Sequence, residues 1–293
     1  MTLFPHTAPR KSGFFAQPRA VRLAVYFPVF VVLLLGWVRL LEWKMTHHPV
    51  AYDGNPDWVL PSKSEDVWFT TADGVKLHGW FLQGRQQPAH GTVLYCHGNG
   101  GNLTYVRGVA HDLALHGLDV LIFDYRGYGR SEGSIPSEAE LYADADAAYD
   151  FLVQTRGVKP EKLAIYGLSL GTTAATDLAS RKACRALVLE APLSSASDMA
   201  SATLPIIPCS LHWILKNRFE SARKIVSVKC PVLVAHGEAD EIIPTEQGRK
   251  VFAAANEPKK LMIIPRGTHW LPSVKGYMDS VAEFIVTNLA TKQ

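Results

Sequence analysis

Residues Lys162 to Gly171 read Lys-Leu-Ala-Ile-Tyr-Gly-Leu-Ser-Leu-Gly and contain the pattern Gly-x-Ser-x-Gly. An apolar run, 163–166, precedes the pattern, and an alanine-rich segment typical of a helix follows it. A serine between a buried strand and a helix, with glycine two positions away on each side, is typical of a tight turn that presents the hydroxyl at the end of a sheet. An ordinary glycine-flanked turn has the same pattern, so Ser169 needs catalytic partners elsewhere in the chain.

From Val67 onward, short apolar runs alternate with amphipathic segments. The first two runs are joined at Asp73-Gly74, which predicts an antiparallel hairpin. Most of the later runs are followed by a helical pattern, and this predicts a mostly parallel sheet with helices on both faces. The strands are expected at 67–71, 75–82, 93–96, 119–123, 163–166, 186–189, 231–235 and 261–264.

In such sheets the chemistry gathers where the strands end, and the run 93–96 ends in the glycine-rich stretch His97 to Asn102. Glycines allow backbone N–H groups to point into a site, so the N–H groups of Asn99 and Leu170 are predicted to form an oxyanion hole. A phosphate or dinucleotide site is disfavoured, because the stretch lacks a Walker lysine and the spacing Gly-x-Gly-x-x-Gly.

Carboxylates follow two of the predicted strands. The run 231–235 leads into Glu238, Asp240 and Glu241, of which Asp240 is favoured as the acid because it precedes an apolar segment and would lie on the loop leaving the strand. Asp124 also follows a strand, but it precedes Ser169 in the chain. It is interpreted as a structural carboxylate that pairs with Arg126 or with backbone amides.

His269 lies in the turn between the last predicted strand and the last helix. From there its imidazole could take the proton of Ser169, while Asp240 fixes its tautomer. The chain order Ser169, Asp240, His269 differs from the orders found in chymotrypsin and subtilisin. The other ten histidines are interpreted as structural.

Together these motifs resemble the α/β-hydrolase superfamily, especially its Bem46-like and YfhR-like membrane-anchored members. The resemblance covers roughly residues 65 to 290. It implies an eight-stranded, mostly parallel sheet and a triad of Ser169, Asp240 and His269 that works through an acyl-enzyme, without metal or cofactor. A serine nucleophile argues against the dehalogenases and epoxide hydrolases of this fold, which use aspartate there. The motifs are His97–Asn102, Asp124–Gly129, Gly167–Gly171, His236–Asp240 and Gly267–His269.

The N-terminus has the pattern of a membrane anchor. Residues 1–22 form a basic tail without acidic residues, and 23–43 are apolar enough to predict a transmembrane helix. A cleaved signal peptide is disfavoured, because no Ala-x-Ala-like site follows. The excess of basic residues before the span predicts a cytoplasmic N-terminus and an exported domain, which in a bacterium would be periplasmic.

The remaining chain divides into a linker, 44–65, and a domain, 66–293, with a short cap at about 191–230. The apolar stretch 204–215 of the cap suits an acyl pocket, a bilayer-facing surface or a packing helix. The net charge of +3 is mild and its residues are scattered, so no nucleic-acid partner is expected. The expected partners are a small or acylated, lipid-like substrate and the membrane, and the oligomeric state stays open.

The four cysteines are Cys96, Cys184, Cys209 and Cys230, and their spacing argues against a zinc site. A bridge between Cys184 and Cys209 is left open, because it depends on the compartment.

Four functions are compatible with this pattern. A carboxylic-ester hydrolase is favoured, and an acyl thioesterase or a peptidase would use the same machinery. A membrane-tethered scaffold without turnover is the alternative outside enzymes. Labelling by a fluorophosphonate that is lost in Ser169→Ala separates the enzymes from the scaffold.

Overall fold

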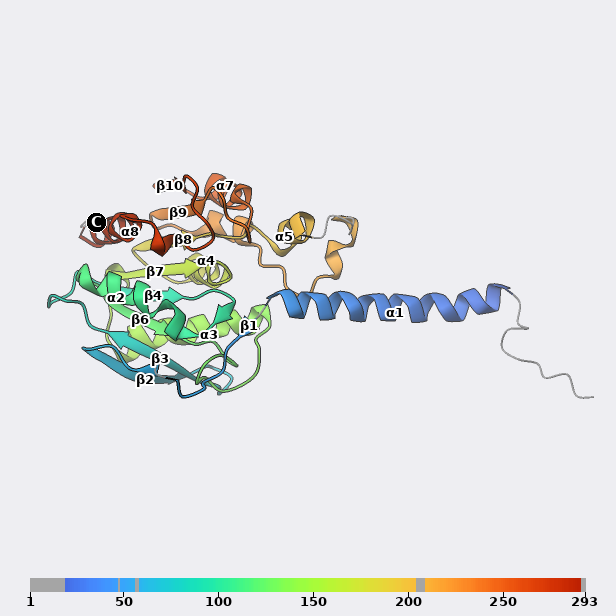
Figure 1. Ribbon diagram of the computed structural model, residues 1–293, viewed down its shortest axis with the longest axis horizontal. Coiled ribbons are helices and arrows are strands. Elements are labelled where there is room, and N and C mark those ends of the chain that lie inside the picture. The colour runs from blue at the N-terminus through green and yellow to red at the C-terminus, as the bar shows by residue number, and fades with distance from the viewer. Residues whose placement is uncertain (1–18, 47, 56–57, 204–208, 291–293) are drawn as a thin grey trace, which may run out of the picture. The chain divides into compact units, whose positions relative to one another are not determined.

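The computed structural model describes residues 19–46, 48–55, 58–203 and 209–290. The chain separates into two compact units, Met1–Trp43 and Lys44–Gln293. Helix α1 (Arg19–Thr46), blue in Figure 1, contains the apolar stretch Leu23–Glu42, with a mean hydropathy of 2.2. It is the one helix in the described part of the chain that is long and apolar enough to cross a membrane. Membrane anchors and signal sequences both have this character.

The second unit is built on an eight-stranded sheet with the order β10-β9-β8-β7-β4-β6-β3-β2 (Figure 1). β3 pairs antiparallel with both β2 and β6, and the other neighbours are parallel. The predicted mostly parallel eight-stranded sheet is therefore confirmed. The strands are β2 (Ser64–Thr70), β3 (Lys76–Leu82), β4 (Thr92–Cys96), β6 (Asp119–Phe123), β7 (Leu163–Leu168), β8 (Ala186–Glu190), β9 (Val232–Gly237) and β10 (Lys259–Ile264).

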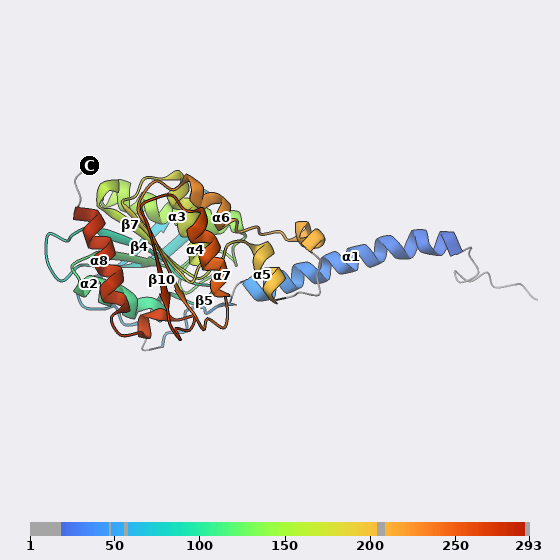
Figure 2. The ribbon, with the colours of Figure 1, turned by 90° about the horizontal axis from the view of Figure 1, so that it is seen from above.

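Helices cover both faces of the sheet, because successive strand residues point to opposite sides. In β4, Leu94 belongs to a core shared with α3, α4 and α7, whereas Tyr95 belongs to a core shared with α2 and α8, which lie close together (Figure 2). The helices are α2 (Arg107–Leu115), α3 (Glu138–Asp150), α4 (Gly171–Arg181), α5 (Ala196–Thr203), α6 (Ser221–Lys224), α7 (Thr245–Ala254) and α8 (Tyr277–Ala290). Short 3₁₀ or π turns are η3 (Leu103–Val106), η4 (Phe151–Thr155), η5 (Pro160–Lys162), η6 (Cys209–Ile214), η7 (Ile225–Ser227) and η8 (Leu271–Ser273).

Part of the expected linker is folded onto the domain. Residues 48–52, which we call the strap, contain β1 (His48–Pro49), which pairs with β5 (Gly100–Gly101) in the glycine-rich loop. The N–H of His48 donates to the carbonyl of Asn99, and that of Val50 donates to the carbonyl of Gly101, both at 2.9 Å. The strap therefore runs along the loop that was predicted to supply an oxyanion donor.

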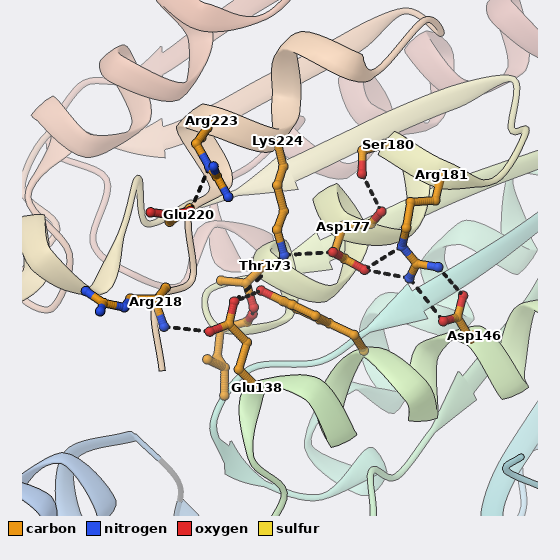
Figure 3. Close-up of polar contacts among 12 residues, drawn as sticks. Glu138, Asp146, Thr173, Asp177, Ser180, Arg181, Arg218, Glu220, Arg223 and Lys224 are labelled. Carbon is orange, nitrogen blue, oxygen red and sulfur yellow. Dashed lines mark hydrogen bonds and ion pairs between the residues drawn. The ribbon is translucent and has the colours of Figure 1, made fainter. Parts of the chain in front are cut away.

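The cap expected at about 191–230 contains α5, η6, α6 and η7, and residues 204–208 of its apolar stretch lie outside the described residues. Its returning arm is tied to α3 and α4 by the polar network of Figure 3. The N–H of Arg218 donates to the carboxylate of Glu138 at 2.5 Å, and the Lys224 ammonium lies 2.7 Å from Asp177. These charge-assisted bonds, the second of them partly buried, fix where the chain re-enters the sheet.

Two cysteines meet at the amino ends of β8 and β9. The sulfur of Cys184 lies 3.4 Å from that of Cys230, and both cysteines are free thiols in the structure. The neighbour that the described residues provide for Cys184 is Cys230, and the side chain of Cys209 lies outside the described residues.

Candidate active site

Ser169 lies at a sharp turn between β7 and α4, with a φ of 52° in the left-handed region. A Cβ atom added to Gly171 would lie 2.1 Å from the carbonyl oxygen of Cys96, and one added to Gly167 would lie 2.6 Å from the Cα of Thr172. Only glycine fits at either position. The strained serine and the close crossing of strand and helix have the geometry of a nucleophile elbow.

The glycine-rich loop passes beside this elbow, since a Cβ on Gly98 would lie 3.4 Å from the Cβ of Ser169. Among the residues that the structure describes, the N–H groups of Asn99 and Leu170 have no hydrogen-bond acceptor. Leu170 is also the N-cap of α4, where the helix dipole favours negative charge. The two N–H groups predicted for the oxyanion hole are thus available to a ligand.

The predicted acid and base lie together. Nδ1 of His269 is 2.9 and 3.0 Å from the two carboxylate oxygens of Asp240, whose side chain is completely buried, whereas the imidazole is 15% exposed. The N–H groups of Ile242 and Ile243 donate to the same carboxylate at 2.9 Å. With Nδ1 donating to Asp240, Nε2 of His269 is left as a proton acceptor.

The ionised state of Asp240 is strongly favoured. Burial by itself would raise its pKa, but hydrogen bonds from His236, His269 and the Ile243 amide outweigh burial and hold the pKa well below its usual range. His236 was interpreted as a structural histidine, and its Nε2 lies 3.2 Å from Asp240 and 2.9 Å from the carbonyl of Ile243. The sequence gives no sign of this contact beyond the spacing of four residues.

The hydroxyl of Ser169 makes no hydrogen bond to His269 or to any other described residue. Catalytic hydrogen bonds of this kind are often long in unliganded enzymes and shorten when substrate binds. The two residues are connected through Glu190, which ends β8. Its carbonyl accepts the N–H of Ser169 at 2.9 Å, and its carboxylate accepts the N–H of Leu271, two residues after His269, at 3.2 Å.

Glu190 is a site residue that the sequence reading missed. Its carboxylate is completely buried and also accepts hydrogen bonds from the hydroxyls of Tyr166 and Tyr277. Burial raises the pKa of Glu190 to about 7, although these hydrogen bonds favour the ionised form. The signal in the sequence is small: a glutamate closes the apolar run Ala-Leu-Val-Leu-Glu of β8.

Asp124 bonds a backbone amide, which is one of the two partners predicted for it, and Arg126, the other predicted partner, pairs elsewhere. Asp124 accepts the N–H of Leu103 at 2.7 Å, as expected for a carboxylate that bonds backbone amides. Arg126 pairs instead with Asp144, at 2.7 Å, and with Asp73, at 2.7 Å. The reason is that the Arg126 side chain turns toward α3, on which Asp144 lies fully buried.

Comparison with known proteins places this geometry in a family. Residues 87–224 match the family described as serine aminopeptidase, S33. Protein YfhR of Salmonella typhi is 35% identical over 253 residues, which cover 79% of this chain and 85% of that protein. Protein Rv2307c of Mycobacterium tuberculosis is 37% identical over 232 residues, covering 78% of this chain and 80% of that protein.

The similarity extends to eukaryotic proteins and to solved structures. Alpha/beta hydrolase domain-containing protein 17B of Xenopus tropicalis is 30% identical over 239 residues, 80% of each chain. The esterase Pf2001 of Pyrococcus furiosus superposes with a TM-score of 0.68 at 23% identity, covering 84% of this chain and all of that one. From its sheet, its elbow and these relatives, the chain belongs to the α/β-hydrolase superfamily.

Proposed function

We propose that this chain is a membrane-anchored serine hydrolase that cleaves carboxylic esters through Ser169, His269 and Asp240. The observation that carries the proposal is the buried carboxylate of Asp240 bonded to Nδ1 of His269, in a fold whose elbow presents Ser169 next to two N–H groups without an acceptor among the described residues. This combination supplies a base, an orienting acid and oxyanion donors, which together are what acyl transfer to serine requires.

The proposed reaction has two halves. Nε2 of His269 takes the proton of Ser169 as its oxygen attacks the ester carbonyl, and the N–H groups of Asn99 and Leu170 stabilise the oxyanion. The imidazolium then protonates the departing alcohol, leaving an acyl-Ser169. Water, deprotonated by His269, attacks this acyl-enzyme, and the imidazolium returns the proton to the oxygen of Ser169 as the acid is released. Asp240 stays ionised throughout, as its low pKa requires.

An apolar acyl group is the proposed substrate feature. Ile242 and Trp270 follow Asp240 and His269 closely in the chain and are 53% and 37% exposed. Exposed apolar side chains beside a proposed catalytic pair suit a lipid-like or acylated substrate. A series of aryl esters from acetate to long-chain acyl tests this: kcat/KM should rise with chain length, and a preference for acetate would contradict it.

A peptidase is the second candidate, because the family matched by residues 87–224 is described as a serine aminopeptidase. The triad would be the same, and only the leaving group would differ. Parallel rates on an aryl ester and on aminoacyl anilides discriminate the two. The ester proposal predicts that kcat/KM is larger for the aryl ester, whose acyl group lacks a free amine, than for the anilides. A dependence on a free α-amine would favour the aminopeptidase.

The proposal as a whole is tested by active-site labelling. A fluorophosphonate should label the full-length protein at Ser169, and Ser169→Ala should abolish labelling while leaving the fold unchanged. Ser180 is a matched control, because its hydroxyl is bonded to the carbonyl of Asp177 on α4, away from the elbow, and Ser180→Ala should label normally. A folded wild-type protein that is not labelled would support the scaffold alternative.

Anchoring through 23–43 with the domain on the exported side is part of the proposal. It is supported by the apolar stretch Leu23–Glu42 and by the basic residues before it. A reporter that is active only after export should be active when fused at the C-terminus. Carbonate extraction should leave the protein in the membrane, whereas its release would point to a cleaved signal sequence.

A further inference from the structure

Glu190 joins the nucleophile strand to the loop of the proposed base. It lies at the end of β8, opposite Leu168 of β7, and its carbonyl accepts the N–H of Ser169. Its carboxylate accepts the N–H of Leu271, and Leu271 follows His269 by two residues. One residue therefore touches the chain on both sides of the proposed proton transfer.

The carboxylate lies among donors rather than beside a basic residue. One oxygen accepts the N–H of Leu271, and the other accepts the hydroxyls of Tyr166 from β7 and Tyr277 from α8, the latter at 3.1 Å. The titratable groups that face it are these two tyrosines, Tyr95 from β4, and His269 from the loop. Of these, His269 can provide a positive charge.

Burying an ionised carboxylate costs free energy unless donors compensate its charge, and a neutral group of the same shape would pack at lower cost. Here the ionised form is matched to its surroundings, because three donors converge on two oxygens that can only accept. A protonated Glu190 would have to donate to one of these partners. The arrangement of donors thus fits an ionised carboxylate at this position in the site.

We propose that Glu190 is a positioning residue of this hydrolase, and that its ionised carboxylate holds the His269 loop in register with the Ser169 elbow and faces the imidazolium that forms during catalysis. The inference rests on the proposed function. It adds a second buried carboxylate, which acts through the loop and through its charge, to the Asp240 that bonds His269 directly.

A pH dependence follows from this role. Burial raises the pKa of Glu190 to about 7, against the hydrogen bonds of Tyr166 and Tyr277 that lower it. The carboxylate therefore changes its charge near neutral pH. If the ionised form positions the loop, kcat/KM should rise as the pH passes through about 7. Below that pH Glu190 takes up a proton, so its titration should make the low-pH limb of the profile steeper than it would be without this carboxylate.

The test is Glu190→Gln in the full-length protein, assayed on an aryl ester. Glutamine keeps an oxygen for the N–H of Leu271 and removes the charge. We expect kcat to fall about tenfold or more at pH 8, because no negative charge then faces the imidazolium that forms during catalysis. KM should stay within about twofold, and the low-pH limb of kcat/KM should be less steep than in the wild type, because Glu190 no longer titrates.

Tyr277→Phe provides a second, milder variant. It removes one donor to the carboxylate and leaves Glu190 able to ionise, so the midpoint of the kcat/KM rise should move to higher pH. Asp144→Asn is the matched control, because Asp144 is also buried and hydrogen-bonded, and burial raises its pKa to about 6, but it pairs with Arg126. That variant should unfold at lower temperature while its kcat/KM profile keeps the wild-type midpoint and slope.

The outcomes separate the two proposals. A wild-type protein that neither labels nor turns over overturns the proposed function, and this inference with it. An active wild type with Glu190→Gln unchanged in kcat and in slope overturns the role of Glu190 alone. Should Glu190→Gln fail to fold, the Tyr277→Phe midpoint decides: a shift to higher pH supports the positioning role, and a wild-type midpoint refutes it.

Discussion

The two sides of Ser169 are held by different means. On the side of the proposed base, the buried carboxylates Asp240 and Glu190 bond His269 and its loop. On the oxyanion side, hydrogen bonds between neutral groups hold the glycine-rich loop. The carbonyl of Asn99 accepts the N–H of His48 in the strap and the hydroxyl of Tyr128, each at 2.9 Å.

The difference follows from the task of each side. A base must gain and lose a proton, so its surroundings need charges that respond to it. Oxyanion donors are peptide N–H groups with a fixed partial charge, and they need only a rigid backbone. The activity should therefore respond to pH and to charge substitutions on the base side. On the oxyanion side it should respond to the loss of the hydrogen bonds that hold the backbone of the loop.

Removing the charge of Asp240 should have the largest effect. In Asp240→Asn the amide cannot hold the Nδ1–H tautomer of His269, and kcat should fall about 10⁴-fold in an aryl-ester assay. Glu238→Gln is the control on the same loop, because Glu238 is exposed, and it should keep wild-type kcat. A loss below about tenfold in Asp240→Asn would mean that another group orients the base.

The two carboxylates should have opposite effects on stability. The folded pKa of Glu190, about 7, is above its unfolded value of 4.5, so its contribution is complete below pH 4.5 and is lost as the pH rises through 7. The loss amounts to about 3 kcal/mol. Asp240, with a lowered pKa, contributes above its unfolded value of 3.8 and loses this contribution as the pH falls.

Urea unfolding of the wild type and of Glu190→Gln at pH 5 and pH 8 measures the first of these effects. The stability difference between the two proteins should shift by about 2 to 3 kcal/mol in favour of the glutamine variant at pH 8. Equal differences at both values would show that Glu190 does not titrate in this range. If Glu190 titrates as expected, stability falls over the same pH interval in which activity is expected to rise.

On the oxyanion side, the role of the strap can be tested by removing a single backbone N–H group. Val50→Pro removes the donor to the carbonyl of Gly101, and we expect kcat to fall about tenfold, less than the loss of a whole oxyanion donor. Ala51→Pro is the matched control, because the N–H of Ala51 donates to no described residue. Its kcat should stay near wild type at every pH, and equal losses in both variants would deny the strap a specific role.

The smallest effect is expected at the amino end of β8, far from the candidate site. Cys184 lies at the amino end of β8, opposite the end that carries Glu190. Cys184→Ser should leave kcat within about twofold and the unfolding free energy within about 1 kcal/mol, because only a partly buried thiol contact is lost. A marked loss of activity would show that the two ends of β8 are coupled.

The sequence predicted what is local or follows from strand order. The elbow is visible in five residues, and the strand-end rule leads to Asp240 and His269. Glu190 was missed because its partner, Leu271, is 81 residues away and a polar residue at the end of a strand is ordinary. The strap was missed because proline and glycine at 44–65 have the composition of a linker, whereas its pairing depends on a loop 52 residues later.

The thiols of Cys184 and Cys230, 3.4 Å apart, have a consequence for cell biology. A pair at this distance can close into a disulfide where a disulfide-donating oxidoreductase operates, and stays reduced where thioredoxin and glutathione prevail. Its oxidation state in intact cells, trapped by acid and read by mass, is therefore a built-in record of the compartment that surrounds the domain.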